Sequence, residues 1–216
     1  MSHVATLPQM LTFQHRYVPA QPDGLPLTLL LLHGSGGDET SLLPIAAEIA
    51  PGTALLSPRG ATEADGVPRF LPLSQNLTLG QDVLSYRVAE LAEFAQNAAA
   101  YYRFDVRRMV ALGYSNGAAM AASLLLFRPR LLLGALILRP VMPTPPLQVP
   151  DLGARPVWIA GGRRDELAPP ADAARLAELL QAAGADVSLR WEQAGHKLHR
   201  AEMLAARVWL AARFRP

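Results

Sequence analysis

Residues 109–127 read MVALGYSNGAAMAASLLLF and decide the fold, because they place one short turn between two strongly apolar runs. The run 109–114 predicts a β-strand that is buried on both faces, and the Ala- and Leu-rich run 118–127 predicts a helix. The turn between them, Gly113-Tyr114-Ser115-Asn116-Gly117, matches the pattern G-x-S-x-G. A strand, a tight turn with a serine and then a helix together project a nucleophilic hydroxyl above a sheet.

The two glycines of this turn have a steric reason. Side chains at Gly113 and Gly117 would collide with the neighbouring strand and helix, so we expect a strained backbone around Ser115. The helix that follows would place the positive end of its dipole near a developing oxyanion. The alternative is a glycine-rich turn with an incidental serine, which leaves the apolar flanks unexplained.

The rest of the chain alternates short apolar runs with longer amphipathic ones, which predicts an α/β fold with a mostly parallel central sheet and helices on both faces. We expect an antiparallel edge strand at 13–17, and apolar side chains three and four residues apart over 84–102 predict one long helix. The remaining expected strands are 27–33, 54–57, 132–138, 157–160 and 187–191, and the remaining expected helices are 172–183 and 199–214.

Two segments without periodicity, Pro58–Thr78 and Pro140–Pro156, each follow a predicted strand. Loops beyond the carboxyl ends of parallel strands form the ligand crevice in such sheets. A long irregular loop inside a compact domain is more often functional than not, although a surface excursion is the alternative for Pro58–Thr78.

Length and composition bound the function. The chain has 216 residues, 50% of them hydrophobic, and a net charge of +2, which predicts a single domain over 1–216 and gives little support to nucleic-acid binding. The Cys count is 0, which excludes disulfides, a thiolate zinc site and a cysteine nucleophile. Residues 1–10 lack a secretory pattern and no apolar stretch reaches the roughly 18 residues of a membrane span, so we expect a cytoplasmic protein without stable membrane insertion.

A serine nucleophile needs a base, and the base needs a carboxylate to orient it. Two histidines follow Ser115 in the chain, His196 and His199. We favour His196 because it lies in the loop directly after the predicted strand 187–191, whereas His199 falls inside the last predicted helix.

The acid is sought after the serine, because nucleophile, acid and base follow one another in that order in this type of sheet. Asp165 lies at the exit of the predicted strand 157–160, from which a carboxylate can reach a histidine on the next strand-end loop. Its neighbour Glu166 is the alternative acid. Asp165 could also be a surface charge balanced by Arg163 or Arg164.

An oxyanion hole requires two backbone N–H donors. We expect one from Asn116, the residue after the nucleophile, and the other from Ser35 in the loop His33-Gly34-Ser35-Gly36-Gly37. His33 precedes Ser115 and is expected to organise this loop by hydrogen bonding. A phosphate-binding loop is the alternative, but neither G-x-G-x-x-G nor G-x-x-x-x-G-K-[ST] occurs in the chain.

Taken together, the segments 32–39, 56–60, 69–70, 113–118, 161–169 and 195–196 resemble the phospholipase/carboxylesterase branch of the α/β-hydrolases, and more narrowly a bacterial subgroup of hydroquinone-linked carboxylesterases. The resemblance covers nearly the whole chain. It implies the α/β-hydrolase fold with a minimal lid, and an esterase that uses no cofactor and no metal. In that family Ser115 would be the nucleophile, Asp165 the acid and His196 the base, with Ser35 and Asn116 at the oxyanion hole.

Three arginines are candidates for contact with a substrate. Where the family often carries His-Pro-Met, this chain reads Arg139-Pro140-Val141-Met142, which would place a cation near the pocket. Arg59 and Arg69 lie in the irregular loop, where each could meet a polar group of the substrate or form a structural salt bridge within the loop.

These observations predict a serine hydrolase that cleaves small carboxylic esters through an acyl-enzyme. A lysophospholipase, an acyl thioesterase or an amidase would use the same chemistry, so all three stay open. A catalytically silent α/β-hydrolase that only binds its ligand is the alternative outside enzymes. The expected partner is a small-molecule ester, and the resemblance leaves a homodimer open.

Overall fold

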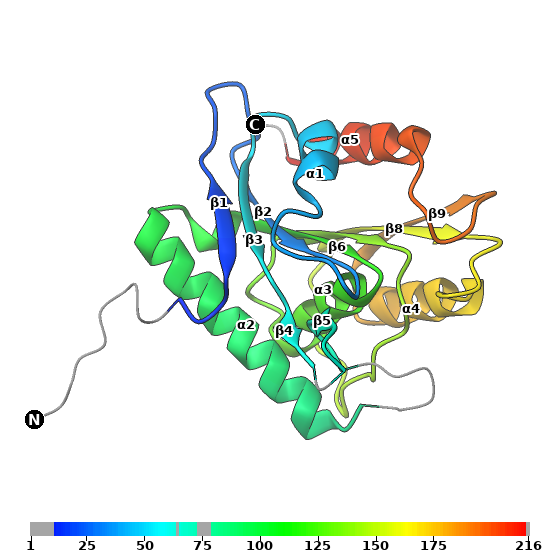
Figure 1. Ribbon diagram of the computed structural model, residues 1–216. Coiled ribbons are helices and arrows are strands. Elements are labelled where there is room, and N and C mark those ends of the chain that lie inside the picture. The colour runs from blue at the N-terminus through cyan, green and yellow to red at the C-terminus, as the bar shows by residue number, and fades with distance from the viewer. Residues whose placement is uncertain (1–10, 64, 73–78, 215–216) are drawn as a thin grey trace, which may run out of the picture.

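The structure, a computed structural model, describes residues 11–63, 65–72 and 79–214 and is built on a seven-stranded sheet of order β1-β3-β2-β6-β7-β8-β9 (Figure 1). Six strands are parallel and β1, at one edge, pairs antiparallel with β3. Both the mostly parallel sheet and the antiparallel edge strand are therefore confirmed. The strands are β1 (His15–Val18), β2 (Thr28–Leu32), β3 (Ala54–Pro58), β6 (Met109–Tyr114), β7 (Gly134–Leu138), β8 (Pro156–Gly162) and β9 (Asp186–Glu192).

Helices cover both faces of the sheet, with α1 and α5 on one face and α2, α3 and α4 on the other (Figure 1). Successive residues of a strand point to opposite faces. In β2, accordingly, Leu29 and Leu31 pack toward α1 and α5, while Leu30 and Leu32 pack toward the other three helices. The helices are α1 (Leu43–Ile49), α2 (Gln81–Tyr102), α3 (Asn116–Phe127), α4 (Pro170–Ala182) and α5 (Arg200–Phe214), with a short 3-10 helix at Val106–Arg108.

The predicted elements agree with the observed ones to within two residues at most of their ends. The strand predicted at 109–114 coincides with β6, and α3 begins two residues before the predicted 118. Helix α1 was not predicted, because its seven residues are too few to show a helical period. The proline in its first turn, Pro44, is its clearest sequence signal.

The expectation of a wholly irregular segment at Pro58–Thr78 is wrong in part. Two short strands, β4 (Ala61–Thr62) and β5 (Pro68–Arg69), pair antiparallel within it. The approach is close because Gly60 lacks a side chain: a Cβ there would lie 2.5 Å from the carbonyl carbon of Arg69. Residues 73–78 of this segment lie outside the described residues.

The connection between β7 and β8, residues 139–155, carries no helix. None of the helices in the described ranges is long and apolar enough to cross a membrane. The expectation about a secretory pattern in residues 1–10 concerns a segment that the structure does not describe.

Candidate active site

Ser115 sits on a strained turn between β6 and α3. Its backbone has φ 55° and ψ −117°, a conformation that a side-chain-bearing residue adopts only under constraint. The constraint is steric, as predicted. A Cβ at Gly113 would lie 2.3 Å from the carbonyl oxygen of Gly117, and a Cβ at Gly117 would lie 1.9 Å from that of Leu32. Only glycine fits at either position, so the strand and helix can close tightly around the serine.

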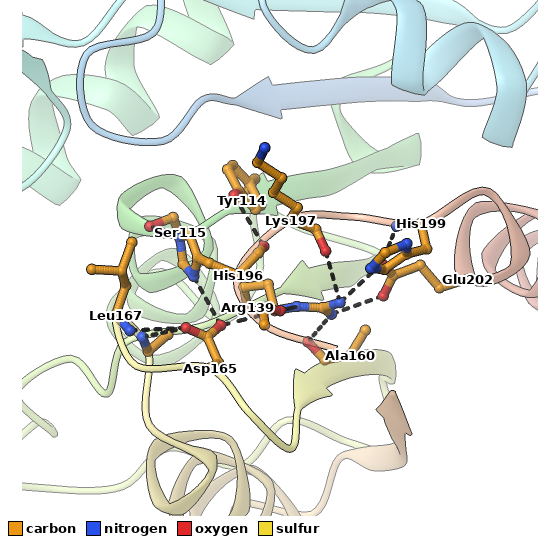
Figure 2. Close-up of polar contacts among 12 residues, drawn as sticks. Tyr114, Ser115, Arg139, Ala160, Asp165, Leu167, His196, Lys197, His199 and Glu202 are labelled. Atoms are coloured by element: carbon orange, nitrogen blue, oxygen red, sulfur yellow. Dashed lines mark hydrogen bonds and ion pairs between the residues drawn. The ribbon is translucent and has the colours of Figure 1, made fainter. Parts of the chain in front are cut away.

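Ser115, His196 and Asp165 form one continuous chain of hydrogen bonds (Figure 2). Nε2 of His196 lies 3.0 Å from the Ser115 hydroxyl, and Nδ1 lies 2.8 Å from Oδ2 of Asp165. A carboxylate at Nδ1 favours the tautomer with the proton on that nitrogen, which leaves Nε2 free to accept the serine proton. The geometry therefore suits a nucleophile, a general base and an orienting acid.

Asp165 is placed by its own loop between β8 and α4. Its side chain is fully buried, and Oδ1 accepts hydrogen bonds from the backbone N–H groups of Leu167 and Ala168 at 3.0 and 2.9 Å. The other oxygen is thereby left to His196. A buried carboxylate with every partner supplied by the protein has one orientation available.

The alternative acid and base lie elsewhere. Glu166, next to Asp165, is exposed. His199 is also exposed and directly precedes α5, where its backbone N–H donates to Glu202. The structure thus brings together Ser115, Asp165 and His196 and leaves Glu166 and His199 outside the hydrogen-bonded chain.

The two residues expected to supply oxyanion donors belong to segments that meet at the nucleophile. Asn116 is the first residue of α3, where backbone N–H groups have no partner within the helix. Ser35 is exposed in the loop after β2, and that loop packs closely on the turn: a Cβ at Gly34 would lie 3.3 Å from the Cβ of Ser115. Their role in binding an oxyanion stays a prediction.

The side chain of Asn116 makes hydrogen bonds that the sequence did not predict. Its buried Oδ1 accepts hydrogen bonds from the backbone N–H groups of Phe70 and Leu71 at 2.9 and 3.1 Å. Its amide nitrogen donates to the Leu71 carbonyl at 2.7 Å. The residue after the nucleophile therefore fastens the segment that follows β5 to the serine turn.

His33 organises its loop, as predicted. Its Nδ1 lies 2.7 Å from the Gly34 carbonyl oxygen, so it is the donor there, and Nε2 accepts a hydrogen bond from the Gly60 N–H at 2.9 Å. The ring is buried, and this burial lowers the pKa of His33. The neutral tautomer is the form that these two contacts require.

Tyr114 is a further neighbour of the base that the sequence did not single out. Its hydroxyl donates to the backbone carbonyl of His196 at 3.1 Å, and the two ring centroids are 5.1 Å apart. Burial, and then the nearby Asp165 charge, raise the pKa of Tyr114. The phenol therefore stays protonated as a donor near neutral pH.

The two loop arginines are engaged in ion pairs. Nε of Arg59 lies 2.5 Å from Glu39, a carboxylate that is nearly buried. Arg69 pairs with Asp65 at 2.7 Å within the loop itself, which is the structural alternative considered from the sequence. Contact of either arginine with a substrate stays a prediction.

The expectation that Arg139 presents a cation to the substrate is wrong. The residue is 0% exposed, and its guanidinium forms a two-point ion pair with Glu202 at 2.8 and 2.9 Å. A charge this deeply buried requires a partner. Sequence reasoning missed this partner because Glu202 looks like an ordinary acidic residue in the first turn of a helix.

Within the described residues, no group of three or more His, Cys, Asp or Glu side chains is arranged to hold a metal ion.

Comparison with known proteins gives consistent matches. Residues 75–204 match the dienelactone hydrolase family. The "Putative hydrolase MhqD" of Bacillus subtilis (strain 168) is 36% identical over 196 residues, which cover 91% of this chain and 96% of that protein. The carboxylesterase of Bacillus cereus is similar in structure with a TM-score of 0.88 and 37% identity, covering 94% of this chain and 95% of that one. A carboxylesterase of Mesorhizobium loti has a TM-score of 0.78 and 35% identity over 86% of this chain and 88% of its own.

Proposed function

Because the chain belongs to the dienelactone hydrolase family, we propose that it cleaves small carboxylic esters through an acyl-enzyme, with Ser115 as the nucleophile. The expected resemblance to carboxylesterase-type α/β-hydrolases is confirmed, and so is the α/β-hydrolase fold. Ester hydrolysis in general is what these relatives support. The serine mechanism and the preference for small esters are the proposal.

One observation carries the proposal: the hydrogen-bonded chain from Ser115 through His196 to Asp165 begins at a serine on a strained strand-to-helix turn. A serine that lay beside a histidine by chance would require neither a buried carboxylate on the far side of the imidazole nor a strained backbone at the serine. The three residues come from the ends of three different parallel strands, which is where ligands bind in open α/β sheets.

In the proposed reaction, Oγ of Ser115 attacks the ester carbonyl while Nε2 of His196 takes the hydroxyl proton. Asp165 holds the imidazole and stabilises the imidazolium. The oxyanion accepts hydrogen bonds from the N–H groups of Ser35 and Asn116, each worth about 3 kcal/mol at comparable sites.

When the tetrahedral intermediate collapses, His196 returns its proton to the leaving alcohol, and the acyl group stays on Ser115 as an ester. Water then enters, loses a proton to His196 and attacks the acyl carbonyl. Collapse of the second intermediate releases the carboxylic acid and restores the Ser115 hydroxyl.

The experiment is a series of initial rates on p-nitrophenyl esters from acetate to palmitate. Wild type is compared with Ser115→Ala and with Ser123→Ala, a matched control whose hydroxyl donates to a carbonyl of its own helix α3. We expect rates that are highest for short acyl chains, fall by at least about 10³-fold in Ser115→Ala, and stay near wild type in Ser123→Ala.

A maximum at long acyl chains would favour a lysophospholipase or thioesterase and contradict the preference for small esters. Equal rates in wild type and Ser115→Ala would contradict the serine mechanism. No Ser115-dependent turnover of any ester would leave the binding role as the better interpretation.

A further inference from the structure

Arg139 is a buried cation between two carboxylates of the site. It follows the last residue of β7, and Figure 2 shows its guanidinium between Asp165 on one side and Glu202 on the other. Its backbone has φ 52°, in the left-handed region that disfavours residues with a side chain. Burying a charged side chain on a strained backbone costs free energy of folding. The contacts of Arg139 therefore indicate what role offsets that cost.

Each of the five N–H groups of this guanidinium donates to an acceptor, and the identity of the five acceptors indicates the role of the residue. Two are the carboxylate oxygens of Glu202. The other three are the backbone carbonyls of Gly195 at 2.9 Å, Ala160 at 3.3 Å and Lys197 at 3.3 Å. An arginine has five donors in one rigid plane, so this set of contacts fixes the acceptors relative to one another.

Two of those carbonyls belong to the residues on either side of His196. The guanidinium therefore holds the backbone of the histidine loop from both sides of the residue that carries the imidazole. Other contacts hold the same loop: the Arg164 N–H donates to the Ala194 carbonyl at 3.0 Å, and a Cβ at Gly162 would lie 2.6 Å from the Gly195 oxygen. The loop is thus seated directly against the end of β8.

Arg139 also lies beside the acid. Its Nε is 4.0 Å from Oδ2 of Asp165, the oxygen that receives the hydrogen bond from His196. One guanidinium therefore contacts the loop of the base and faces the carboxylate of the acid. Glu202 balances its charge and also accepts a hydrogen bond from the His199 N–H, which ties the start of α5 to the same unit.

We propose that Arg139, paired with Glu202, is the positioning residue that holds the imidazole of His196 in line between Ser115 and Asp165. This inference rests on the proposed function, because it assigns a role within the same triad. Stability alone does not call for such a group, since well-packed apolar residues commonly replace buried ion pairs without loss. The direction of the donors, toward the two carbonyls that flank His196, is what a positioning role requires.

The test is Arg139→Lys, which keeps the positive charge but has three donors on a flexible stem instead of five in a plane. Its matched control is Arg155→Lys directly before β8, where a half-buried arginine likewise donates to two backbone carbonyls, those of Leu132 and Leu152. Active sites are counted with a fluorophosphonate, so that kcat refers to reactive enzyme only. The low-field NMR resonance of the His196 Nδ1 proton reports the hydrogen bond to Asp165 without any substrate.

For Arg139→Lys we expect kcat per active site to fall by about 10- to 100-fold, the range expected when a catalytic group is misplaced by about an ångström. KM should change by less than about threefold, because the arginine does not touch the substrate. The Nδ1 proton resonance should shift or broaden. For Arg155→Lys we expect wild-type kcat and an unchanged resonance, whatever its effect on the melting temperature.

Glu202→Gln is the second variant, in case Arg139→Lys does not fold. It leaves Arg139 without its balancing charge while retaining an oxygen that can accept hydrogen bonds, so we expect a smaller fall in kcat and the same kind of change in the resonance. A wild-type kcat and resonance in Arg139→Lys, with only a lower melting temperature, would overturn the inference. If Arg139→Lys does not fold, the same result in Glu202→Gln would overturn it. Failure of the proposed function would differ, because wild type itself would then show no fluorophosphonate label on Ser115.

Discussion

The turn around Ser115 and the neighbouring segment 58–72 lie against each other, yet they are held by different means. The turn is fixed by close contacts between backbone atoms, where Gly113 and Gly117 leave no room for a side chain. The segment is held by polar contacts with distant parts of the chain. The amide of Asn116 binds its end, the imidazole of His33 binds its beginning, and Glu39 binds Arg59.

This contrast explains why a short motif predicts the turn, whereas no motif predicts how the segment is held. A collision with a backbone atom restricts the residue type to glycine at the position itself, so the motif displays the constraint wherever the colliding atom lies in the chain. Hydrogen bonds to a loop depend on residues that the sequence places tens of positions away, such as Asn116, 45 residues after Leu71.

Gly117→Ala should break the turn. The added Cβ would lie 1.9 Å from the Leu32 carbonyl oxygen, a backbone atom that cannot move without shifting β2. We expect the free energy of unfolding, measured by urea denaturation, to fall by about 3 kcal/mol or more. Gly80→Ala is the control, because none of the residues that the structure describes would lie within 4 Å of a Cβ there, and its effect should stay below about 1 kcal/mol. Similar unfolding midpoints for the two variants would contradict the steric account.

Asn116→Ala should release the segment and leave the turn folded. The N–H groups of Phe70 and Leu71 would lose their buried acceptor, at a cost of about 1–3 kcal/mol in stability. Hydrogen exchange measured by NMR should show faster exchange of these two amides, with the amides of β6 still protected. Unchanged protection at Phe70 and Leu71 would mean that the Asn116 side chain does not hold the segment.

Because His33 holds the start of this segment, the free energy of unfolding should depend on pH through its imidazole. Burial lowers the pKa of His33 below its ordinary value of 6.5, so below that pH the unfolded chain binds a proton that the folded chain resists. Stability is therefore fully present above pH 6.5 and falls as the pH decreases toward the lowered pKa, by at most about 1.4 kcal/mol per pH unit.

Urea denaturation of wild type and His33→Gln at about pH 8 and about pH 5.5 checks this linkage. Wild type should lose more stability than the variant on acidification, because the variant has no titrating group at this position. An equal loss in both proteins would show that His33 does not contribute to the pH dependence.

Much of the candidate site could be predicted because parallel strands end at one edge. The G-x-S-x-G turn identified Ser115, and strand-end loops favoured His196 over His199 and Asp165 over Glu166; the structure brings those three favoured residues together. These predictions required only the approximate positions of the strands and the order of the residues along the chain. Errors of one or two residues in the bounds of an element change neither.

The rest could not be predicted, because it depends on pairing across the fold. An arginine is expected at the surface by its chemistry, and the burial of Arg139 follows only from Glu202, 63 residues further along the chain. The hydroxyl of Tyr114 likewise finds its acceptor at His196, 82 residues away. Nothing near either residue in the sequence indicates these partners.

Trapping the acyl-enzyme shows most directly whether Ser115 carries the acyl group. Wild type, Ser115→Ala and Ser123→Ala would each be mixed with p-nitrophenyl acetate, quenched in acid during the first turnover and analysed by mass spectrometry of the intact chain and its peptides. We expect one acetyl group on the peptide that contains Ser115 in wild type and Ser123→Ala, and none in Ser115→Ala. Turnover of the ester with no acetyl group on Ser115, or with the group on another residue, would contradict the claim.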